Sequence, residues 1–392
     1  MPAEITRKFE ALEAQAQKLM AAFIKAGHEA VAPSIIQPAG VFLDVIGEQL
    51  RARTYVFTDP DGDELCLRPD LTVPTCRLHM ERNPDGAKKA KYCYNGPAFR
   101  FQPQGAGAAH PREFRQAGIE SFGTPDREKA DAQTVAILLD ALRAAGLKEW
   151  KLRIGDLGIL RALRQAADMP ELHRQRLLHQ FWRPAAFRDE LKRLSAIGRP
   201  ATSRLPAALL SSLDPANLPD AEKKIAKYLA AEGLEPVGVR SLTEIAQHLL
   251  TRVAEERAEP VKPEIAELIG RYVGVTAPAR AAGARLKDIM RERGIDISSA
   301  LDAYHRRLQM LGEAGVDVVH AEFSAEFGRS LEYYTGFVFE VVVPILGPES
   351  PVAGGGRYDR LMKAVGAPDD VPAVGAAIHT ERLLTIVDTE AK

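Results

Sequence analysis

Residues 92–122 carry the clearest signal of fold class in this chain, with the sequence YCYNGPAFRFQPQGAGAAHPREFRQAGIESF. Short apolar and aromatic segments, such as residues 92–94 and 99–101, are separated by proline, glycine and polar residues. This pattern is typical of strands joined by turns. With the similar segments that precede it, the stretch predicts that residues from about 30 to 122 are rich in β-strands.

Amphipathic helices are predicted on either side of this strand-rich region. Apolar residues recur at helical spacing over residues 9–23, and Gly27 then provides a C-terminal cap. A second helix is expected from residues 124–126, where Thr124 gives an N-cap with Pro125 at the first helical position, with apolar residues of 135–142 on one face and Gly146 at its end. Residues 150–154 then alternate between apolar and charged side chains, which indicates a half-buried strand.

The chain is long enough for more than one compact unit. Its 392 residues exceed the size at which a single hydrophobic core normally stops growing. Strand-like segments occur in residues 1–159 and again in 315–392, whereas residues 160–314 are rich in Ala, Leu, Arg and Glu at helical spacing. We therefore expect an α+β core in two parts, completed by the C-terminal segment, around a mainly helical insertion.

The overall composition excludes several classes of protein. The chain has 52 Lys and Arg against 53 Asp and Glu, a formal net charge of -1, so it lacks the strong positive field of a dedicated nucleic-acid binder. A hydrophobic fraction of 46% with 27% charged residues is ordinary for a folded globular protein. Neither a disordered chain nor a repetitive, collagen-like one fits these values.

Cysteine usage and apolar patterning indicate a protein that works in the cytoplasm. Three cysteines without C-x-x-C spacing suggest neither a disulfide framework nor a zinc site. The longest apolar stretch, residues 338–346, is interrupted by Glu340 and Pro344 and is too short for a membrane helix. Charged residues occupy the positions near the N-terminus where a secretory leader needs an apolar segment, so no leader is expected.

Charged side chains within aromatic, strand-like surroundings are the candidate binding residues. Arg100 lies between two phenylalanines, Glu120 lies in an apolar strand-like segment, and Arg329 precedes a pair of tyrosines. Because an unpaired buried charge is costly, a pocket that offers both cations and anions suits a zwitterion such as an amino acid. The alternative is that these side chains point outward on a solvated sheet face, and their spacing alone does not decide between the two.

Three further patterns have a structural as well as a functional interpretation. The glycines of residues 354–356 form either an ordinary turn or a close approach to a ligand. The basic and aromatic residues over 174–193 form either a nucleic-acid or partner surface or, as we prefer, the solvated face of an amphipathic helix. His305, His320 and His379 have no neighbour at metal-ligand spacing, so no metal or cofactor is expected.

Taken in order, five segments of the chain resemble the motifs of the histidyl-tRNA synthetase family of class II synthetases. The resemblance extends over essentially the whole chain apart from the helical insertion. It implies a class II aminoacyl-tRNA synthetase-like fold, with a mainly antiparallel sheet flanked by helices. The matching segments are residues 67–72, 96–102 together with 115–120, 329–336, 355–359 and 381–383.

The resemblance also implies a histidine pocket. The family positions that hold the ammonium, read the imidazole and take the carboxylate of histidine all have polar or charged residues in this chain. A site that matches a substrate's own donors and acceptors rejects ligands that lack them. The implied histidine-binding residues are Asp70, Thr72 and Gln116 for the ammonium, Glu120 and Tyr334 for the imidazole, Arg329 for the carboxylate, and in addition Arg100 and Tyr333.

The nucleotide half of the implied site departs from the family pattern. Arg100 and Arg382 occupy the positions that grip ATP phosphates, but Gln102 replaces a glutamate and His379 replaces a glycine that leaves space for adenosine. The loop over residues 105–110 is also poor in basic residues, and no anticodon-binding domain is expected after Arg382. The histidine contacts are thus retained better than the ATP contacts.

This combination resembles the regulatory subunits of ATP phosphoribosyltransferase, a family of synthetase paralogues. The resemblance implies a non-catalytic subunit that activates a short-form catalytic subunit and mediates histidine feedback inhibition in the first step of histidine biosynthesis. The implied assembly is a homodimer within a hetero-octamer, without tRNA, membrane or cofactor. Two alternatives remain: a truncated histidyl-tRNA synthetase or other histidine-adenylating enzyme, which the retained Arg329 would equally fit, and a scaffold that binds no small molecule.

Overall fold

A computed structural model of the chain describes residues 6–43, 50–102, 111–181, 183–196, 206–233, 241–327, 333–347 and 350–390. The chain divides into two compact units. Unit 1 combines residues 1–166 with residues 271–392, and unit 2 comprises residues 167–270. Unit 2 thus interrupts unit 1 in the sequence, and unit 1 is built from both ends of the chain.

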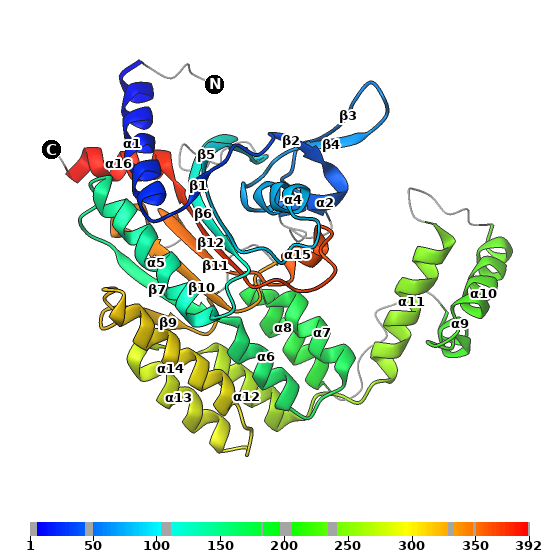
Figure 1. Cartoon of the computed structure of the whole chain (residues 1–392). Helices are drawn as coiled ribbons and strands as arrows, with labels where there is room; N and C mark the ends of the chain where they lie inside the picture. The colour runs from blue at the N-terminus through cyan, green and yellow to red at the C-terminus, as the bar shows by residue number, and fades with distance from the viewer. Residues whose placement is uncertain are drawn as a thin grey trace. The chain divides into compact units, whose positions relative to one another are not determined.

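Unit 1 is built on a large sheet that is mainly antiparallel, as expected (Figure 1). Two neighbouring pairs of strands are parallel, β1 with β5 and β7 with β9. Three strands from the C-terminal segment lie in the middle of the sheet, so the N-terminal strands cannot form it alone. In spatial order, the strands in the described part of the chain are β1 (Glu29–Ala30), β5 (Ala90–Phe99), β6 (Glu113–Phe122), β12 (Ala373–His379), β11 (Ala353–Arg357), β10 (Phe337–Val342), β7 (Lys151–Asp156), β9 (Glu322–Ser324) and β8 (Thr276–Pro278).

A second, three-stranded sheet and several short helices complete the N-terminal part of unit 1. The small sheet has the order β2, β4, β3, and all its strand pairs are antiparallel. Its elements and the nearby short helices are β2 (Ile36–Pro38), α2 (Ala39–Leu43), β3 (Val56–Thr58), β4 (Glu64–Leu67), α4 (Thr72–Arg82), the 3-10 helix η1 (Pro344–Leu346) and α15 (Leu361–Ala364).

Longer helices cover one face of the large sheet. Because side chains alternate along a strand, Ile119 of β6 and its neighbours Ala376 and Ile378 of β12 face these helices, whereas Gln116 and Glu120 face the other way. Helix α5 packs against β6 and β12, and also against α1 and α14 (Figure 1). The other helices of unit 1 in the described residues are α1 (Thr6–Lys25), α5 (Arg127–Ala144), α6 (Leu157–Ala166), α13 (Ala279–Arg291), α14 (Ser298–Glu313) and α16 (Thr380–Glu390).

The helix and the strand predicted from residues 124–154 are both confirmed. The helix starts two residues later than predicted, because Asp126 rather than Thr124 is the N-cap of α5; its side chain accepts a hydrogen bond of 3.2 Å from the backbone N–H of Lys129. Such a cap satisfies one of the backbone donors that every helix leaves unpaired at its start. Strand β7 begins at Lys151, so the alternating pattern identified it to within a residue.

A buried network of charges ties α5 and α14 to the sheet. The Asp131 carboxylate of α5 accepts hydrogen bonds from Arg357 of β11 at 2.7 and 3.0 Å, and from Arg307 of α14 at 2.8 Å. Arg307 also donates to Asp156, at the end of β7, at 2.5 Å. All four side chains are buried. Removing one partner from such a network leaves a buried charge without compensation, which is strongly destabilising.

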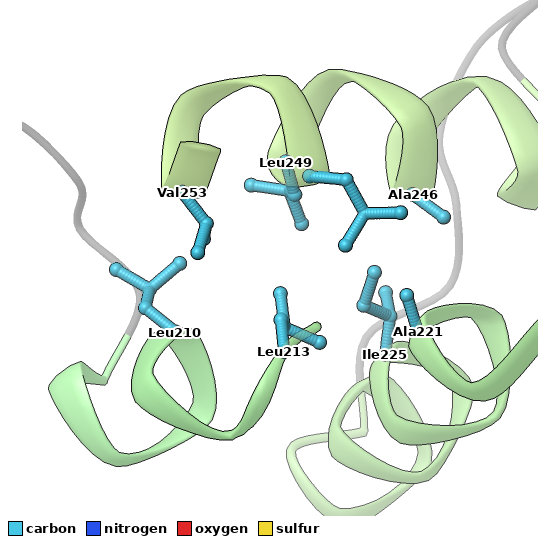
Figure 2. Close-up of a cluster of buried hydrophobic side chains, with 8 residues drawn as sticks. Leu210, Leu213, Ala221, Ile225, Ala246, Leu249 and Val253 are labelled. Atoms are coloured by element: carbon cyan, nitrogen blue, oxygen red, sulfur yellow. The ribbon is translucent and has the colours of Figure 1, made fainter. Parts of the chain in front are cut away.

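Unit 2 is helical. Its elements are α7 (Glu171–Gln180), α8 (Pro184–Ser195), α9 (Ala207–Ser212), α10 (Leu218–Ala231), α11 (Leu242–Arg257) and the first part of α12 (Pro263–Val273). Figure 2 shows apolar side chains from three of these helices pointing toward one another, among them Leu213, Ile225 and Leu249. Leu213 is 1% exposed, so this cluster is the local core of α9, α10 and α11.

Two details differ from the sequence-based expectations. The predicted insertion spans residues 160–314, but α13 and α14 belong to unit 1, because α14 packs against α5 and its Arg307 enters the buried network. The glycines of residues 354–356 form the middle of strand β11 rather than a turn. A Cβ atom on Gly355 would overlap the neighbouring strand, so glycine permits close packing there.

The basic residues over 174–193 are partly neutralised within unit 2. Arg176 donates to Glu190 at 2.5 Å and to Glu255 at 2.6 Å, and Arg193 donates to Glu190 at 2.6 Å. These pairs favour the interpretation as an amphipathic helical segment over a nucleic-acid surface. None of the helices over the described residues has the length and apolar character needed to cross a membrane.

We predict that Leu213→Ala opens unit 2 locally. The change removes a buried side chain from the core of α9, α10 and α11 and should destabilise it by about 2–5 kcal/mol. Hydrogen exchange should therefore accelerate in these three helices and stay unchanged in α5 of unit 1. Ser211→Ala, at an exposed position of α9 two residues before Leu213, is the matched control. Equal exchange in the parent protein and the Leu213 variant would contradict this description of the cluster.

Candidate functional site

The face of the large sheet away from the long helices carries the candidate site. Gln116 and Glu120 of β6 lie on this face, opposite His379 and Gly375 of β12. Glycine is required at position 375, because any Cβ atom there would overlap the Glu120 carboxyl group. The two strands therefore leave room for a buried polar group at a place where sheets are normally packed with apolar side chains.

A small pocket opens on this face. Six of the eight predicted histidine-binding residues are brought together here, from the start of α4 and the turn before it, the residue after β5, strand β6 and the segment before β10. The lining residues are Asp70, Thr72, Arg100, Gln116, Tyr333, Tyr334, Gly354, Gly375, Ala376 and Ala377.

Among the described residues, two buried acceptor atoms of the pocket have no hydrogen-bond partner, namely Oδ2 of Asp70 and Oε1 of Gln116. The other oxygen of Asp70 accepts a hydrogen bond of 3.2 Å from the N–H of Val73, in the first turn of α4. An unsatisfied buried polar group costs about 1–3 kcal/mol, so the protein alone leaves this site incomplete. Both vacant atoms are acceptors, and a ligand that completes the site must therefore donate hydrogen bonds.

The charge balance at Asp70 favours a donor that is also a cation. Asp70 is 3% exposed, and this burial raises the pKa of its carboxyl group despite the opposing effect of the Arg100 guanidinium. A raised pKa means that the anion lacks sufficient compensation. A ligand ammonium group would supply both the missing charge and the missing donors.

Glu120 lies beneath the pocket rather than in its lining. Its side chain is fully buried, and its two carboxyl oxygens accept hydrogen bonds from the hydroxyl of Tyr94, at 2.9 Å, and from that of Tyr358. Burial raises the pKa of Glu120 from its ordinary value of 4.5 to about 7, although hydrogen bonds from Tyr358, Thr72 and Tyr94 act in the opposite direction. Thr72, which lines the pocket, therefore connects Glu120 to any ligand bound there.

The tyrosine pair before β10 forms one wall of the pocket. The rings of Tyr333 and Tyr334 have centroids 5.0 Å apart, and Tyr333 meets Tyr358 edge-on at 5.7 Å. The ring of Tyr334 also lies against Gly356, where a Cβ atom would come within 2.9 Å of it. Arg329, the predicted carboxylate ligand, lies outside the described residues.

The residues at the nucleotide-binding positions contact other parts of the chain. Arg100 donates to the carbonyl of Pro69 at 2.8 Å, and its guanidinium lies 5.0 Å from the ring of Phe114. The His379 ring is 5.5 Å from the same phenylalanine. Of the four predicted nucleotide-site residues, only Arg100 lines the pocket.

Arg382 and Gln102, at the other two nucleotide-binding positions, also take part in hydrogen bonds to backbone carbonyls. Arg382 donates to the carbonyl of Pro351 at 2.8 Å, and the carbonyl of Gln102 accepts a hydrogen bond of 3.2 Å from Arg112. Within the described ranges, no group of three or more His, Cys, Asp or Glu side chains is placed to hold a metal ion.

Three residues of the site were missed from the sequence. Phe114 lies two residues before Gln116, so the alternation along β6 already placed it on the same face. Gly375 sits within an apolar strand, where a glycine indicates a close approach. Tyr358 carried no such signal, because its contact with Glu120 joins residues 238 positions apart.

Comparisons with known proteins bear on this geometry. The sequence profile of the family "Histidyl-tRNA synthetase" matches residues 5–253 and 241–383. Proteins named "ATP phosphoribosyltransferase regulatory subunit" from Brucella anthropi and Rhizobium rhizogenes are each 34% identical to this chain. The first alignment covers 92% of this chain and 93% of the relative, and the second covers 94% and 96%.

Two solved structures share the fold at low sequence identity. A Bacillus halodurans protein described as an ATP phosphoribosyltransferase regulatory subunit/histidyl-tRNA synthetase aligns with a TM-score of 0.69 and 20% identity, over 99% of this chain and 82% of the other. A histidine–tRNA ligase subunit from Alicyclobacillus acidocaldarius aligns with a TM-score of 0.61 and 22% identity, over 100% and 97%. These likenesses establish the class II synthetase-like α+β fold that the motifs led us to expect.

We predict that Glu120 makes the stability of the protein depend on pH. Because the pKa of about 7 in the folded protein exceeds the ordinary 4.5, this group stabilises the native state fully below about pH 4.5. That contribution is lost as the pH rises through about 7. In Glu120→Gln the group no longer titrates, so this part of the pH dependence should disappear.

Urea unfolding at about pH 5 and about pH 8 measures the difference. Between these conditions, the free energy of unfolding of the parent should fall by up to about 3 kcal/mol more than that of the glutamine variant. Glu113→Gln, at an exposed position of the same strand, is the control. If the parent and Glu120→Gln lose the same amount, Glu120 is not protonated in the native protein.

Proposed function

The chain belongs to the histidyl-tRNA synthetase family, and from this premise we propose that it is the regulatory subunit of ATP phosphoribosyltransferase. The observation that carries the proposal is the match to proteins of that name over nearly the full length of both chains. In this role it joins a short-form catalytic subunit, activates it, and makes it sensitive to histidine. It thereby controls the first step of histidine biosynthesis.

The pocket on the sheet supports histidine as the effector. Asp70 and Gln116 present two unpartnered acceptors that suit the ligand's ammonium group. Tyr334 forms a wall of the pocket, and Thr72 lines the pocket and also hydrogen-bonds to the buried Glu120. An aromatic wall and a nearby acid favour a polar ring such as imidazole. Arg329 is assigned to the carboxylate through the family motif alone.

Several contacts support a regulatory rather than a catalytic role. Arg100 and His379 both contact Phe114, and Arg382 donates a hydrogen bond to the carbonyl of Pro351. These side chains are therefore engaged within the chain at the positions where an enzyme of the family binds phosphate or adenine. Gln102 lacks the negative charge of the family's glutamate at that position. Histidine-dependent exchange between ATP and pyrophosphate separates this proposal from the alternative of a histidine-adenylating enzyme, which requires such exchange.

Control by histidine follows from differential affinity. A ligand shifts an assembly between an active and an inhibited state only by binding one state better than the other. The ligand donates hydrogen bonds to acceptors that the protein leaves open. A state of the complex in which the pocket is deformed would lose these hydrogen bonds and would bind the ligand less tightly. Histidine thus stabilises the arrangement in which Asp70 and Gln116 converge.

The proposed assembly contains a homodimer of this chain within a hetero-octamer. The small sheet supports a second copy as a neighbour, because it exposes large apolar side chains at Ile36, Val56 and Phe57. Patches of this kind often mark protein interfaces. We also place the protein in the cytoplasm, in keeping with the free, buried thiols of its three cysteines.

Co-expression with a short-form catalytic subunit tests the proposal. We expect the two chains to co-purify, the catalytic subunit to turn over faster in the complex, and added histidine to inhibit it. Asp70→Asn should still form the activated complex but require at least about tenfold more histidine for inhibition, because it loses a charged acceptor that faces the ligand. Asp61→Asn, an exposed change in a turn, should behave like the parent.

Each outcome addresses a separate part of the proposal. Failure of the parent to bind or activate the catalytic subunit would refute the regulatory role. Activation without sensitivity to histidine would refute the effector. Equal sensitivity of the parent and Asp70→Asn would remove Asp70 from the site.

A further inference from the structure

We propose that Arg357 is a positioning residue for the ligand pocket, although its side chain lies on the opposite face of the sheet. Its buried guanidinium fixes the end of β11. Its backbone carbonyl holds residues 333–335, here called the tyrosine segment, which form one wall of the pocket. The inference rests on the proposed function only for the identity of the ligand, histidine.

The backbone of Arg357 anchors the tyrosine segment directly. The ladder between β10 and β11 ends at the pair Val338 and Gly356, so the carbonyl of Arg357 is not used by β10. It instead accepts hydrogen bonds from the backbone N–H of Thr335 at 2.7 Å and from the Thr335 hydroxyl at 3.3 Å. Thr335 directly follows Tyr334, so its position determines where the tyrosine ring lies.

A second bond closes this connection into a loop. The Thr335 hydroxyl accepts a hydrogen bond of 3.0 Å from the N–H of Asp359. The residues on either side of Arg357 act on the pocket face as well, since Gly356 receives the Tyr334 ring and the Tyr358 hydroxyl donates to Glu120. Residues 356–358, at the end of β11 and just after it, thus position both the tyrosine wall and the buried carboxyl group of Glu120.

The side chain of Arg357 explains why this strand end stays in place. Its register with Val374 directs the side chain toward the helices, where it donates to Asp131 of α5 at 2.7 and 3.0 Å. It also donates to Asp359 at 2.8 Å and to the carbonyl of Arg127 at 2.9 Å. A buried, planar guanidinium that donates four hydrogen bonds has little conformational freedom.

Arg307 provides a matched comparison within the same network. It is buried to a similar degree and bonds to the other oxygen of Asp131, at 2.8 Å. Its remaining contacts are Asp156, Glu128 and the ring of Phe337. Among the described residues, it makes no hydrogen bond to β11 or to the tyrosine segment. Loss of either arginine should therefore weaken the fold, but only loss of Arg357 should disturb the pocket.

The test compares Arg357→Lys with Arg307→Lys in the full-length protein. Lysine keeps the positive charge but cannot reproduce the several directed hydrogen bonds of the planar guanidinium group. Both variants should unfold at lower urea concentration than the parent. Calorimetry with histidine should show at least about tenfold weaker binding for Arg357→Lys, because small displacements of positioned groups have effects of this size or larger. Arg307→Lys should bind within about twofold of the parent. Equal losses of affinity in the two variants would overturn the proposal.

A readout without ligand keeps this test separate from the proposed function. Hydrogen exchange at the amide of Thr335 should accelerate in Arg357→Lys by at least about tenfold and stay unchanged in Arg307→Lys. If the parent binds no histidine, the proposed effector fails, and the exchange result alone decides the role of Arg357. Unchanged exchange at Thr335 in Arg357→Lys would refute that role.

A second variant covers the case in which Arg357→Lys does not fold. Thr335→Val preserves the shape of the side chain and the buried charges but removes both hydroxyl bonds to the strand end. We expect weaker histidine binding in this variant, with a smaller fall in the urea midpoint than a change within the buried charge network causes. Histidine affinity equal to that of the parent would contradict the proposal.

Discussion

The carboxyl group of Glu120, fully buried in the middle of the large sheet, constrains the residues around it. Its oxygens require donors, which the hydroxyls of Tyr94 and Tyr358 supply from two other parts of the sheet. Its volume requires that the facing residue of β12 be Gly375. A buried acid of this kind is costly, so its presence indicates a site shaped for a ligand rather than for stability.

The two halves of the synthetase-like site have diverged in a physically consistent way. The half that faces the sheet centre keeps open acceptors at Asp70 and Gln116, which a ligand can satisfy. In the other half, Arg100, His379 and Arg382 contact Phe114 or backbone carbonyls of their own chain. In the function that we propose, the first half gains from an amino-acid ligand, whereas the second is engaged in contacts within the chain. A sensor requires only the first.

Local patterns in the sequence predicted much of this structure. The capping pattern at residues 124–126, the alternation over residues 150–154 and the motif spacing located α5 to within two residues of its start, the strands and most of the pocket. Properties that depend on distant contacts were not predictable. The place of the glycines of β11 within a strand was missed because their neighbouring strands are separated from them in sequence, and Glu120 was expected in the lining because nothing local revealed its tyrosine partners. The assignment of α14 to unit 1 likewise depends on a buried ion network.

A crystal structure with bound histidine tests the central claim most directly. The account predicts the ligand's ammonium nitrogen within about 2.7–3.2 Å of both Oδ2 of Asp70 and Oε1 of Gln116, with Glu120 still held by its two tyrosines. An empty pocket at saturating histidine, or a ligand whose carboxylate faces Asp70, would contradict it.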